Sequence, residues 1–324
     1  MSGVVFHVGL PKTGTTTLQK AVFPRLAGVA YAGKRIPGYG FATTALGEAI
    51  AATISADSAL ADPAPQLAAA IAELRAQCGT STLVISTESL AHPAARDLGL
   101  VAHRLARAAP DARILITLRA QESLALSWFR SHGRFAQYLF THKSEAERIP
   151  AQLTQRAWWD LVVREPRAGL LATLDFDAIV SCYERHFDGR VTVLPLELLS
   201  QDAASYASRL ASVLEVPASA CAPHLADAHE NRGLSAREVA AGRFLARLGR
   251  STSFLEHRDR SALRRWLAAG PRADAALDAS IAADLRARFA AGNARLSARL
   301  SSSPSSRLAS STDLSLASLG YACA

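Results

Sequence analysis

Short apolar runs alternate with longer stretches of helical character along most of the chain. Five runs rich in Val, Ile and Leu predict buried strands, at residues 4–8, 29–33, 82–86, 113–118 and 190–194. The stretches between and after them predict helices, near residues 15–26, 43–55, 64–77, 94–109, 121–133, 157–163, 170–186, 203–214, 234–249, 259–268 and 274–299. Because helices separate the strands, we expect right-handed crossovers and a mostly parallel sheet.

The order of these elements predicts a single α/β domain over residues 1–300, with a helical C-terminal extension from about residue 234. From residue 301 to 324 the chain is rich in Ser and Ala, so we expect a flexible tail. No apolar run approaches the roughly 18 residues that a membrane span needs. The N-terminus also lacks the basic and apolar segments of a secretory signal, which favours a cytoplasmic location without a membrane span.

Charge narrows the class of ligand. The 324 residues carry a formal net charge of +8, and a basic surface favours anionic ligands. No basic run with interleaved aromatic side chains predicts nucleic-acid binding, so we expect a small anionic molecule instead. The four cysteines are scattered and have no histidine partners at metal-binding spacing, and we therefore expect no metal site.

The loop after the first predicted strand carries the strongest chemical signal. Residues 9–14 read Gly-Leu-Pro-Lys-Thr-Gly, and a helix is predicted to begin at Thr15. Backbone N–H groups at a helix start have no partner within the helix, and the helix dipole adds partial positive charge there. Lys12 adds a full positive charge, so this stretch predicts a site for a phosphate-like anion.

The spacing of this loop departs from the nucleoside-triphosphate loop, which follows G-x-x-x-x-G-K-[ST]. Gly9 and Gly14 are spaced accordingly, but Thr15 occupies the lysine position, and Lys12 comes two residues before the second glycine. The run Pro-Lys-Thr-Gly-Thr-Thr instead resembles the 5′-phosphosulfate loop of sulfotransferases that use 3′-phosphoadenosine 5′-phosphosulfate (PAPS). This resemblance implies a P-loop-like three-layer α/β fold. It also implies that the 5′-phosphosulfate is bound by Lys12, Thr13, Gly14, Thr15, Thr16 and Thr17.

An arginine and a serine follow the fourth predicted strand. Arg119 stands at the carboxyl end of that strand, where open α/β sheets bind ligands, and Ser127 follows a little over two helical turns later. A guanidinium and a hydroxyl at this spacing are able to hold a phosphate together. PAPS sulfotransferases show the same pattern, which implies that Arg119 and Ser127 bind the 3′-phosphate.

A carboxylate follows the third predicted strand. Glu88 lies in Thr-Glu-Ser, which is similar to the Ser-Ser-Glu of bacterial members of the family, and the similarity implies that Glu88 is the general base. His92 is the rival base, four residues further on. His7 lies inside the first strand, and we interpret it as a core histidine.

A polar stretch precedes the C-terminal helices. Residues 229–235 read His-Glu-Asn-Arg-Gly-Leu-Ser, and Ser235 with Glu238 matches a capping box. Bacterial sulfotransferase-like chains are similar here, so we expect Asn231 and Arg232 to contact the nucleotide.

Together these signals indicate an enzyme that transfers a sulfuryl group from PAPS to an acceptor hydroxyl, without a metal. The resemblance implies a carbohydrate or lipid-linked glycan as acceptor, in-line displacement, Lys12 as the residue that stabilises the leaving phosphate, and Glu88 as base. Two alternatives stay open. One is a P-loop kinase or nucleoside triphosphatase, and the other is a nucleotide-binding protein of the same fold without catalysis.

Overall fold

The computed structural model describes most of the chain and divides it into two compact units. The described residues are 3–34, 40–55, 62–91, 97–130, 153–164, 170–226, 235–247, 262–271, 276–302 and 315–323. The first unit comprises Met1–Ala120, Gly169–Glu230 and Arg286–Ala324, and the second comprises Gln121–Ala168 and Asn231–Leu285. That both units make up the single domain expected for residues 1–300 stays a prediction.

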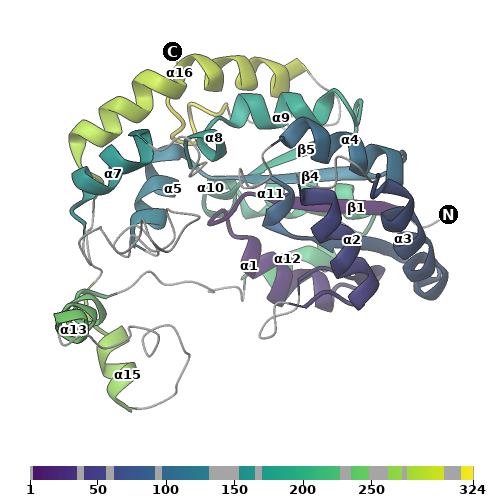
Figure 1. The fold of residues 1–324 in the computed structure, drawn as a ribbon, viewed down its shortest axis with the longest axis horizontal. Coiled ribbons are helices and arrows are strands. Elements are labelled where there is room, and N and C mark those ends of the chain that lie inside the picture. The colour runs from purple at the N-terminus through teal and green to yellow at the C-terminus, as the bar shows by residue number, and fades with distance from the viewer. Residues whose placement is uncertain are drawn as a thin grey trace. The chain divides into compact units, whose positions relative to one another are not determined.

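A parallel sheet forms the centre of the first unit (Figure 1). Within the described residues its strands are β1 (Val4–Gly9), β2 (Val29–Tyr31), β3 (Thr82–Ser86), β4 (Arg113–Leu118) and β5 (Val191–Pro195). Their order is β2-β3-β1-β4-β5, and every pairing among them is parallel. β1 is fully buried at the centre of the sheet. The strands β2 and β3 lie on one side of β1 in the strand order, and β4 and β5, which come later in the chain, lie on the other. The loop after β1 therefore occupies the switch point at which such sheets bind ligands.

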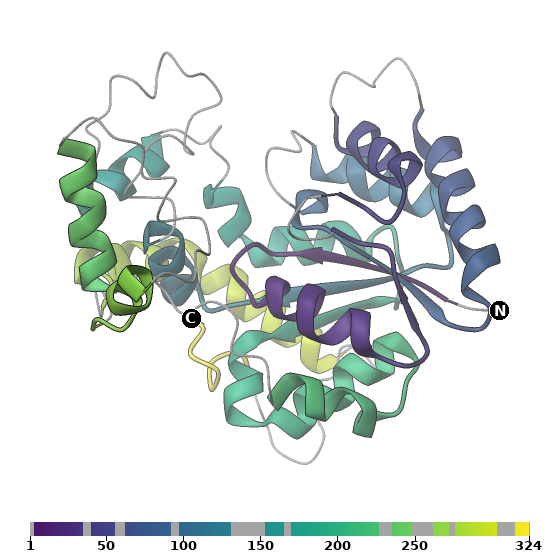
Figure 2. The same ribbon diagram turned by 90° about the horizontal axis from the view of Figure 1, so that it is seen from below.

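Helices cover both faces of this sheet, as Figure 2 shows. One face carries α2 (Thr44–Ile54), α3 (Ala64–Cys78), α4 (Leu98–Ala108) and α9 (Phe176–Glu184). The other carries the helical segment that begins at Thr15, together with α11 (Ala203–Leu214) and α12 (Ala218–Ala226). Strands covered on both faces have continuous apolar sequences, which explains why they were readable as short apolar runs. The prediction of a three-layer α/β fold around a parallel sheet is confirmed.

Several helices differ from their predicted bounds. The segment predicted as one helix over residues 15–26 consists of α1 (Thr15–Thr17), the π-helical η1 (Leu18–Val22) and the 3₁₀ turn η2 (Phe23–Arg25). The helix predicted over residues 170–186 is divided into α8 (Leu170–Leu174) and α9. Asp175 causes this division, because its carboxylate accepts a hydrogen bond from the N–H of Ala178, 3.1 Å away, and caps α9. Among the α-helices of the described residues, α10 (Leu196–Gln201) and α12 escaped prediction.

The C-terminal part of the chain is more ordered than its composition indicates. Helix α16 extends over Ala279–Ser302, three residues beyond its predicted end. Residues 315–323 form turns, and three of their apolar side chains are buried, those of Leu316, Leu319 and Tyr321. These three side chains give residues 315–323 an apolar anchor, and the flexible tail expected over residues 301–324 stays a prediction.

The second unit is helical where it is described. Its helices are α5 (Gln121–Trp128), α7 (Gln155–Arg164), α13 (Ala236–Arg247), α15 (Ala262–Ala268) and the first residues of α16. Trp159 is buried, and its indole N–H donates to the Asp284 carboxylate over 2.7 Å. The predicted capping box is confirmed, since the N–H of Glu238 donates to Ser235 Oγ and the N–H of Ser235 donates to Glu238 Oε2. None of the helices in the described part of the chain has the length and apolarity to cross a membrane.

Candidate active site

The loop between β1 and α1 has a tightly constrained backbone. Gly14 adopts φ 87°, and Lys12 adopts φ 68°, a left-handed geometry that residues with a side chain seldom adopt. The hydroxyl of Thr13 donates to the Leu10 carbonyl over 2.5 Å and lies 2.6 Å from the hydroxyl of Thr117 on β4. Left-handed backbone of this kind is held in place by its surroundings and clusters at ligand sites. Here the buried Thr13 side chain supplies that constraint.

Two cations meet at this loop. Arg119, directly after β4, donates from Nη1 to the carbonyl oxygen of Lys12 over 3.4 Å. Burial disfavours the charged ammonium and lowers the pKa of Lys12, and the positive charge of Arg119 lowers it further, while Glu88 acts in the opposite direction. The two positive charges act on each other in a partly buried place, and a bound anion would offset that repulsion. The pair therefore favours a ligand with more than one negative charge.

Glu88 lies on the other side of the loop, at the start of the 3₁₀ turn η4 (Glu88–Leu90) after β3. Its Oε1 accepts from the hydroxyl of Thr15 over 2.7 Å and from Gln19 Nε2 over 3.4 Å, and its Oε2 lies 3.9 Å from Lys34 Nζ. Burial alone would raise the pKa of the Glu88 carboxyl, but the Thr15 hydrogen bond and the nearby positive charge of Lys34 hold it below the usual value. Glu88 is thus an ionised carboxylate at neutral pH.

A buried hydrogen-bond network lies beneath the loop. His7 Nδ1 is 2.7 Å from Ser86 Oγ, and its Nε2 is 3.4 Å from Thr117 Oγ1. Gln19 Nε2 donates to the same Ser86 hydroxyl over 3.1 Å. Burial disfavours the imidazolium and lowers the pKa of His7 to about 4, so the ring is neutral. The interpretation of His7 as a core histidine is confirmed, and the network links Thr13 under one end of the loop to Glu88 beside the other.

The predicted phosphosulfate-binding residues divide by what they offer a ligand. The side chains of Thr13 and Thr15 are buried, and their hydroxyls already donate within the protein. These two residues can therefore contribute only backbone groups to ligand binding. The N–H of Thr17 donates to the Gly14 carbonyl over 3.0 Å, as part of the helix start. Lys12, Gly14 and Thr16 are half-buried at the surface of the loop. The hydroxyls of Thr13 and Thr15 thus hold the loop in shape, and that its backbone and Lys12 bind an anion stays a prediction.

The predicted site residues that belong to the first unit lie together at one edge of the sheet, whereas the positions of the other predicted residues relative to them stay predictions. Lys12, Glu88 and Arg119 follow β1, β3 and β4, which are adjacent strands, so all three lie at one edge of the sheet. Ser127 is half-buried on α5 of the second unit, and its pairing with Arg119 stays a prediction. Three further predicted residues lie outside the described residues: His92, Asn231 and Arg232.

Two further residues of this edge, Gln19 and Glu197, were not predicted from the sequence. Gln19 is buried, and its amide donates to both Ser86 and Glu88. The sequence signal for this role was a polar residue at a helix position that faces the sheet. Glu197 accepts a hydrogen bond from the N–H of Ala120 over 3.0 Å, next to Arg119. Its signal was the run Pro-Leu-Glu-Leu-Leu after the fifth strand, because a proline followed by an acidic residue is typical of a helix start.

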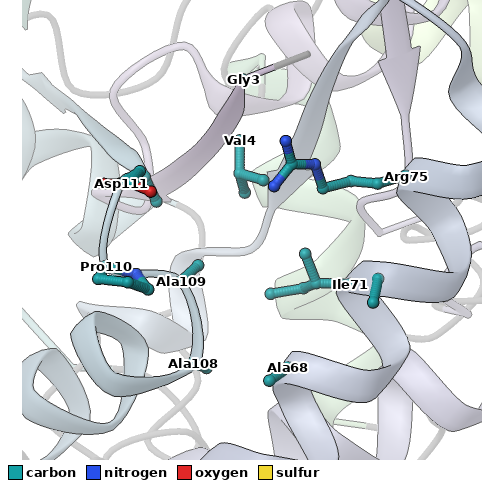
Figure 3. Close-up of a pocket in the computed structure, with 11 residues that line it drawn as sticks. Gly3, Val4, Ala68, Ile71, Arg75, Ala108, Ala109, Pro110 and Asp111 are labelled. Atoms are coloured by element: carbon teal, nitrogen blue, oxygen red, sulfur yellow. The ribbon is translucent and has the colours of Figure 1, made fainter. Parts of the chain in front are cut away.

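A separate hollow of about 370 Å³ lies at the opposite edge of the sheet, where β1 and β4 begin (Figure 3). Gly3, just before β1, and Val4 of β1 line it with alanines of α3 and α4, and Arg75 reaches across it toward Val4. Its lining is mainly apolar, and it lies at the amino ends of the strands, whereas the loop lies at their carboxyl ends. This hollow is therefore distinct from the anion site.

The fold and the site define a class: an α/β protein with a glycine-bearing loop, Lys12 and Arg119 at the carboxyl edge of a parallel sheet. No model of a known protein family matches the sequence, and no curated protein matches it. Among solved structures, a sulfotransferase from Alicyclobacillus acidocaldarius is similar, with 20% identity, a TM-score of 0.45, and coverage of 82% of this chain and 100% of that one. A sulfotransferase domain from the curacin biosynthetic pathway is also similar, with 14% identity, a TM-score of 0.43, and coverage of 89% and 98%. The function proposed next rests on the chain's own residues.

Proposed function

We propose that the protein is a sulfotransferase that moves the sulfuryl group of PAPS to an acceptor hydroxyl. The observation that carries this proposal is that Arg119 bonds to the backbone of Lys12 and its charge lowers the pKa of the Lys12 ammonium, while ionised Glu88 accepts from Thr15 of the same loop. A donor with two separate anionic groups fits two cations, and a hydroxyl acceptor needs a base. The acceptor class, a carbohydrate or lipid-linked glycan, rests on the family resemblance alone, and the cytoplasmic location stays an expectation from the sequence.

In the proposed reaction the residues have three roles: they bind the 5′-phosphosulfate, bind the 3′-phosphate and remove the proton of the acceptor. Lys12 and the loop backbone hold the 5′-phosphosulfate, and Lys12 stabilises the charge that grows on the phosphate oxygen as its bond to sulfur breaks. Arg119 holds the 3′-phosphate, with Ser127 and Arg232 as further contacts. Glu88 takes the proton of the acceptor hydroxyl while the acceptor oxygen forms its bond to sulfur in line. The products are a sulfate ester and adenosine 3′,5′-bisphosphate.

The alternative of a P-loop kinase or nucleoside triphosphatase predicts a cation at position 15. Thr15 stands there, is 3% exposed, and donates its hydroxyl to Glu88. The nearest cation of the loop is instead Lys12, held in a left-handed backbone geometry. These contacts favour the sulfuryl donor.

Calorimetry with two nucleotides tests the donor class. We expect adenosine 3′,5′-bisphosphate to bind more tightly than ATP, whether or not Mg²⁺ is present, because the second phosphate meets Arg119. Adenosine 5′-phosphate, which lacks the 3′-phosphate, is the matched control and should bind at least tenfold more weakly than the bisphosphate, since a charge-assisted hydrogen bond contributes roughly 1.5–3 kcal/mol. Tighter binding of ATP that depends on Mg²⁺ would contradict the proposal and support the kinase alternative.

Nucleotide affinity should also depend on pH through Lys12. Its pKa is lowered, so the ammonium loses its proton below the ordinary lysine value of about 10.4, and affinity for adenosine 3′,5′-bisphosphate should fall as the pH rises through that lowered pKa. Titrations from about pH 7 to pH 11 at constant ionic strength measure this decline. In the variant Lys12→Arg the decline should disappear, because a guanidinium stays protonated throughout. An unchanged decline in that variant would assign the titration to another group.

A further inference from the structure

The C-terminal segment packs against the first unit through specific contacts. Tyr321 is 3% exposed, and its ring lies edge-on to that of Phe176 with 6.0 Å between centroids. Asn293 of α16 donates from Nδ2 to the carbonyl oxygen of Ala322 over 2.7 Å. A Ser- and Ala-rich segment would have little reason to adopt one position without such contacts. The last residues of the described chain therefore hold the phenol of Tyr321 in a defined place.

That phenol is bonded to a carboxylate of the site. The hydroxyl of Tyr321 donates to Glu197 Oε2 over 3.0 Å. The other oxygen of this carboxylate, Oε1, accepts from the backbone N–H of Ala120, also over 3.0 Å. Glu197 thus uses one oxygen for the C-terminal segment and the other for the turn after β4. The carboxylate connects two parts of the chain that are about 200 residues apart in sequence.

The turn held by Glu197 carries the cation that the proposed function assigns to the 3′-phosphate. Ala120 directly follows Arg119, so fixing the N–H of Ala120 fixes the peptide unit from which the Arg119 side chain departs. Arg119 is also close enough to Tyr321 for its charge to act on the phenol, whose pKa is raised mainly by burial. The neighbour of Glu197 on α10, Leu196, lies against Gly14, where an added Cβ would meet Leu196 Cδ1 at 2.9 Å. Helix α10 therefore touches both the phosphosulfate loop and the Arg119 turn.

We propose that Tyr321 and Glu197 are positioning residues of the nucleotide site: the C-terminal segment, through the hydrogen bond from Tyr321 to Glu197, orients the Arg119 turn for a 3′-phosphate. This inference rests on the proposed function. It assigns a role to a segment whose composition indicates only a tail. It also predicts that the C-terminus affects selectivity for a 3′-phosphate more than it affects binding of the rest of the nucleotide.

The test compares two nucleotides in one variant. Tyr321→Phe removes only the hydroxyl and keeps the buried ring. We expect its Kd for adenosine 3′,5′-bisphosphate to rise about tenfold, as for the loss of a hydrogen bond to a charged group, while its Kd for adenosine 5′-phosphate changes by less than about twofold. With PAPS at saturation, kcat should stay near the wild-type value and KM for PAPS should rise. Tyr206→Phe, at a buried tyrosine of α11, is the matched control and should leave both Kd values unchanged.

Three outcomes separate this inference from the proposed function. If the wild-type protein prefers the bisphosphate and Tyr321→Phe keeps that preference, the positioning role is wrong and the proposed function stands. An equal loss of affinity for both nucleotides would likewise reduce Tyr321 to a structural residue. If the wild-type protein itself does not distinguish the two nucleotides, the 3′-phosphate site and the positioning role both fail. A second variant, Glu197→Gln, keeps an oxygen for Ala120 but weakens the charge-assisted bond from Tyr321, and should show the same selectivity change to a smaller extent.

Discussion

Replacing Lys12 by alanine is expected to lower the turnover of sulfuryl transfer about 10²–10³-fold, the effect seen when one group that stabilises transition-state charge is removed. The ammonium of Lys12 belongs to the loop that holds the sulfuryl group, and its interaction strengthens as the bond between sulfur and phosphate oxygen breaks. The loss should therefore fall mainly on kcat. Nucleotide affinity should fall less, since Arg119 and the loop backbone still bind the two anionic groups.

The same replacement should not destabilise the protein. In the unliganded state Lys12 is partly desolvated and lies beside the like charge of Arg119, and both effects lower its pKa. Removing the ammonium removes this repulsion, so the melting temperature of Lys12→Ala should equal or exceed that of the wild type. Lys20→Ala, at a half-buried lysine of η1 outside the loop, is the matched control and should retain full turnover. Normal turnover in Lys12→Ala would remove the lysine from the mechanism.

The parts of the site that could be predicted are those whose residues follow one another closely in the sequence. The loop from Gly9 to Gly14 was readable because a strand, two glycines and a helix start follow one another directly. β3 and β4 matched their predicted bounds, since both are covered on two faces and so are mainly apolar along their length. Once the sheet is parallel, the carboxyl ends of its strands share one edge, and Lys12, Glu88 and Arg119 must come together.

The contacts that escaped prediction are those between distant segments. The bond from Tyr321 to Glu197 joins residues 124 positions apart, and that from Gln19 to Ser86 joins residues 67 positions apart. Neither has a local pattern, because a hydrogen bond needs only one suitable atom on each side. The short helix α10 was missed for another reason, since six residues after a proline give too little periodicity to recognise. The sequence therefore predicts which chemical groups meet at this edge, whereas the groups that hold them in place depend on the folded chain.

For Glu88, the replacement by glutamine is expected to lower turnover about 10²–10⁴-fold, the range attributed to a positioned general base. Glutamine keeps an oxygen that accepts from Thr15, so the loop contact made by Glu88 over 2.7 Å is preserved while the basic group is lost. Removing a negative charge beside the anion site should leave the affinity for adenosine 3′,5′-bisphosphate unchanged or increase it. A purely structural role predicts the opposite, a loss of nucleotide affinity together with turnover. Glu73→Gln, at an exposed glutamate of α3, is the matched control.

The pH profile of the wild-type enzyme separates Glu88 from its rival His92. Because the pKa of Glu88 is lowered, its carboxylate is present above the ordinary glutamate value of about 4.3 and is protonated only as the pH falls through the lowered pKa. If Glu88 is the base, kcat/KM for the acceptor should stay constant from about pH 7 down to about pH 5. A decline centred near the ordinary histidine value of about 6.5 would point to His92 instead. In that case Glu88→Gln should retain activity, so the pH profile and the turnover of this variant must agree. The Glu88 carboxylate, held ionised by Thr15 and Lys34, would then orient the loop instead of accepting the proton.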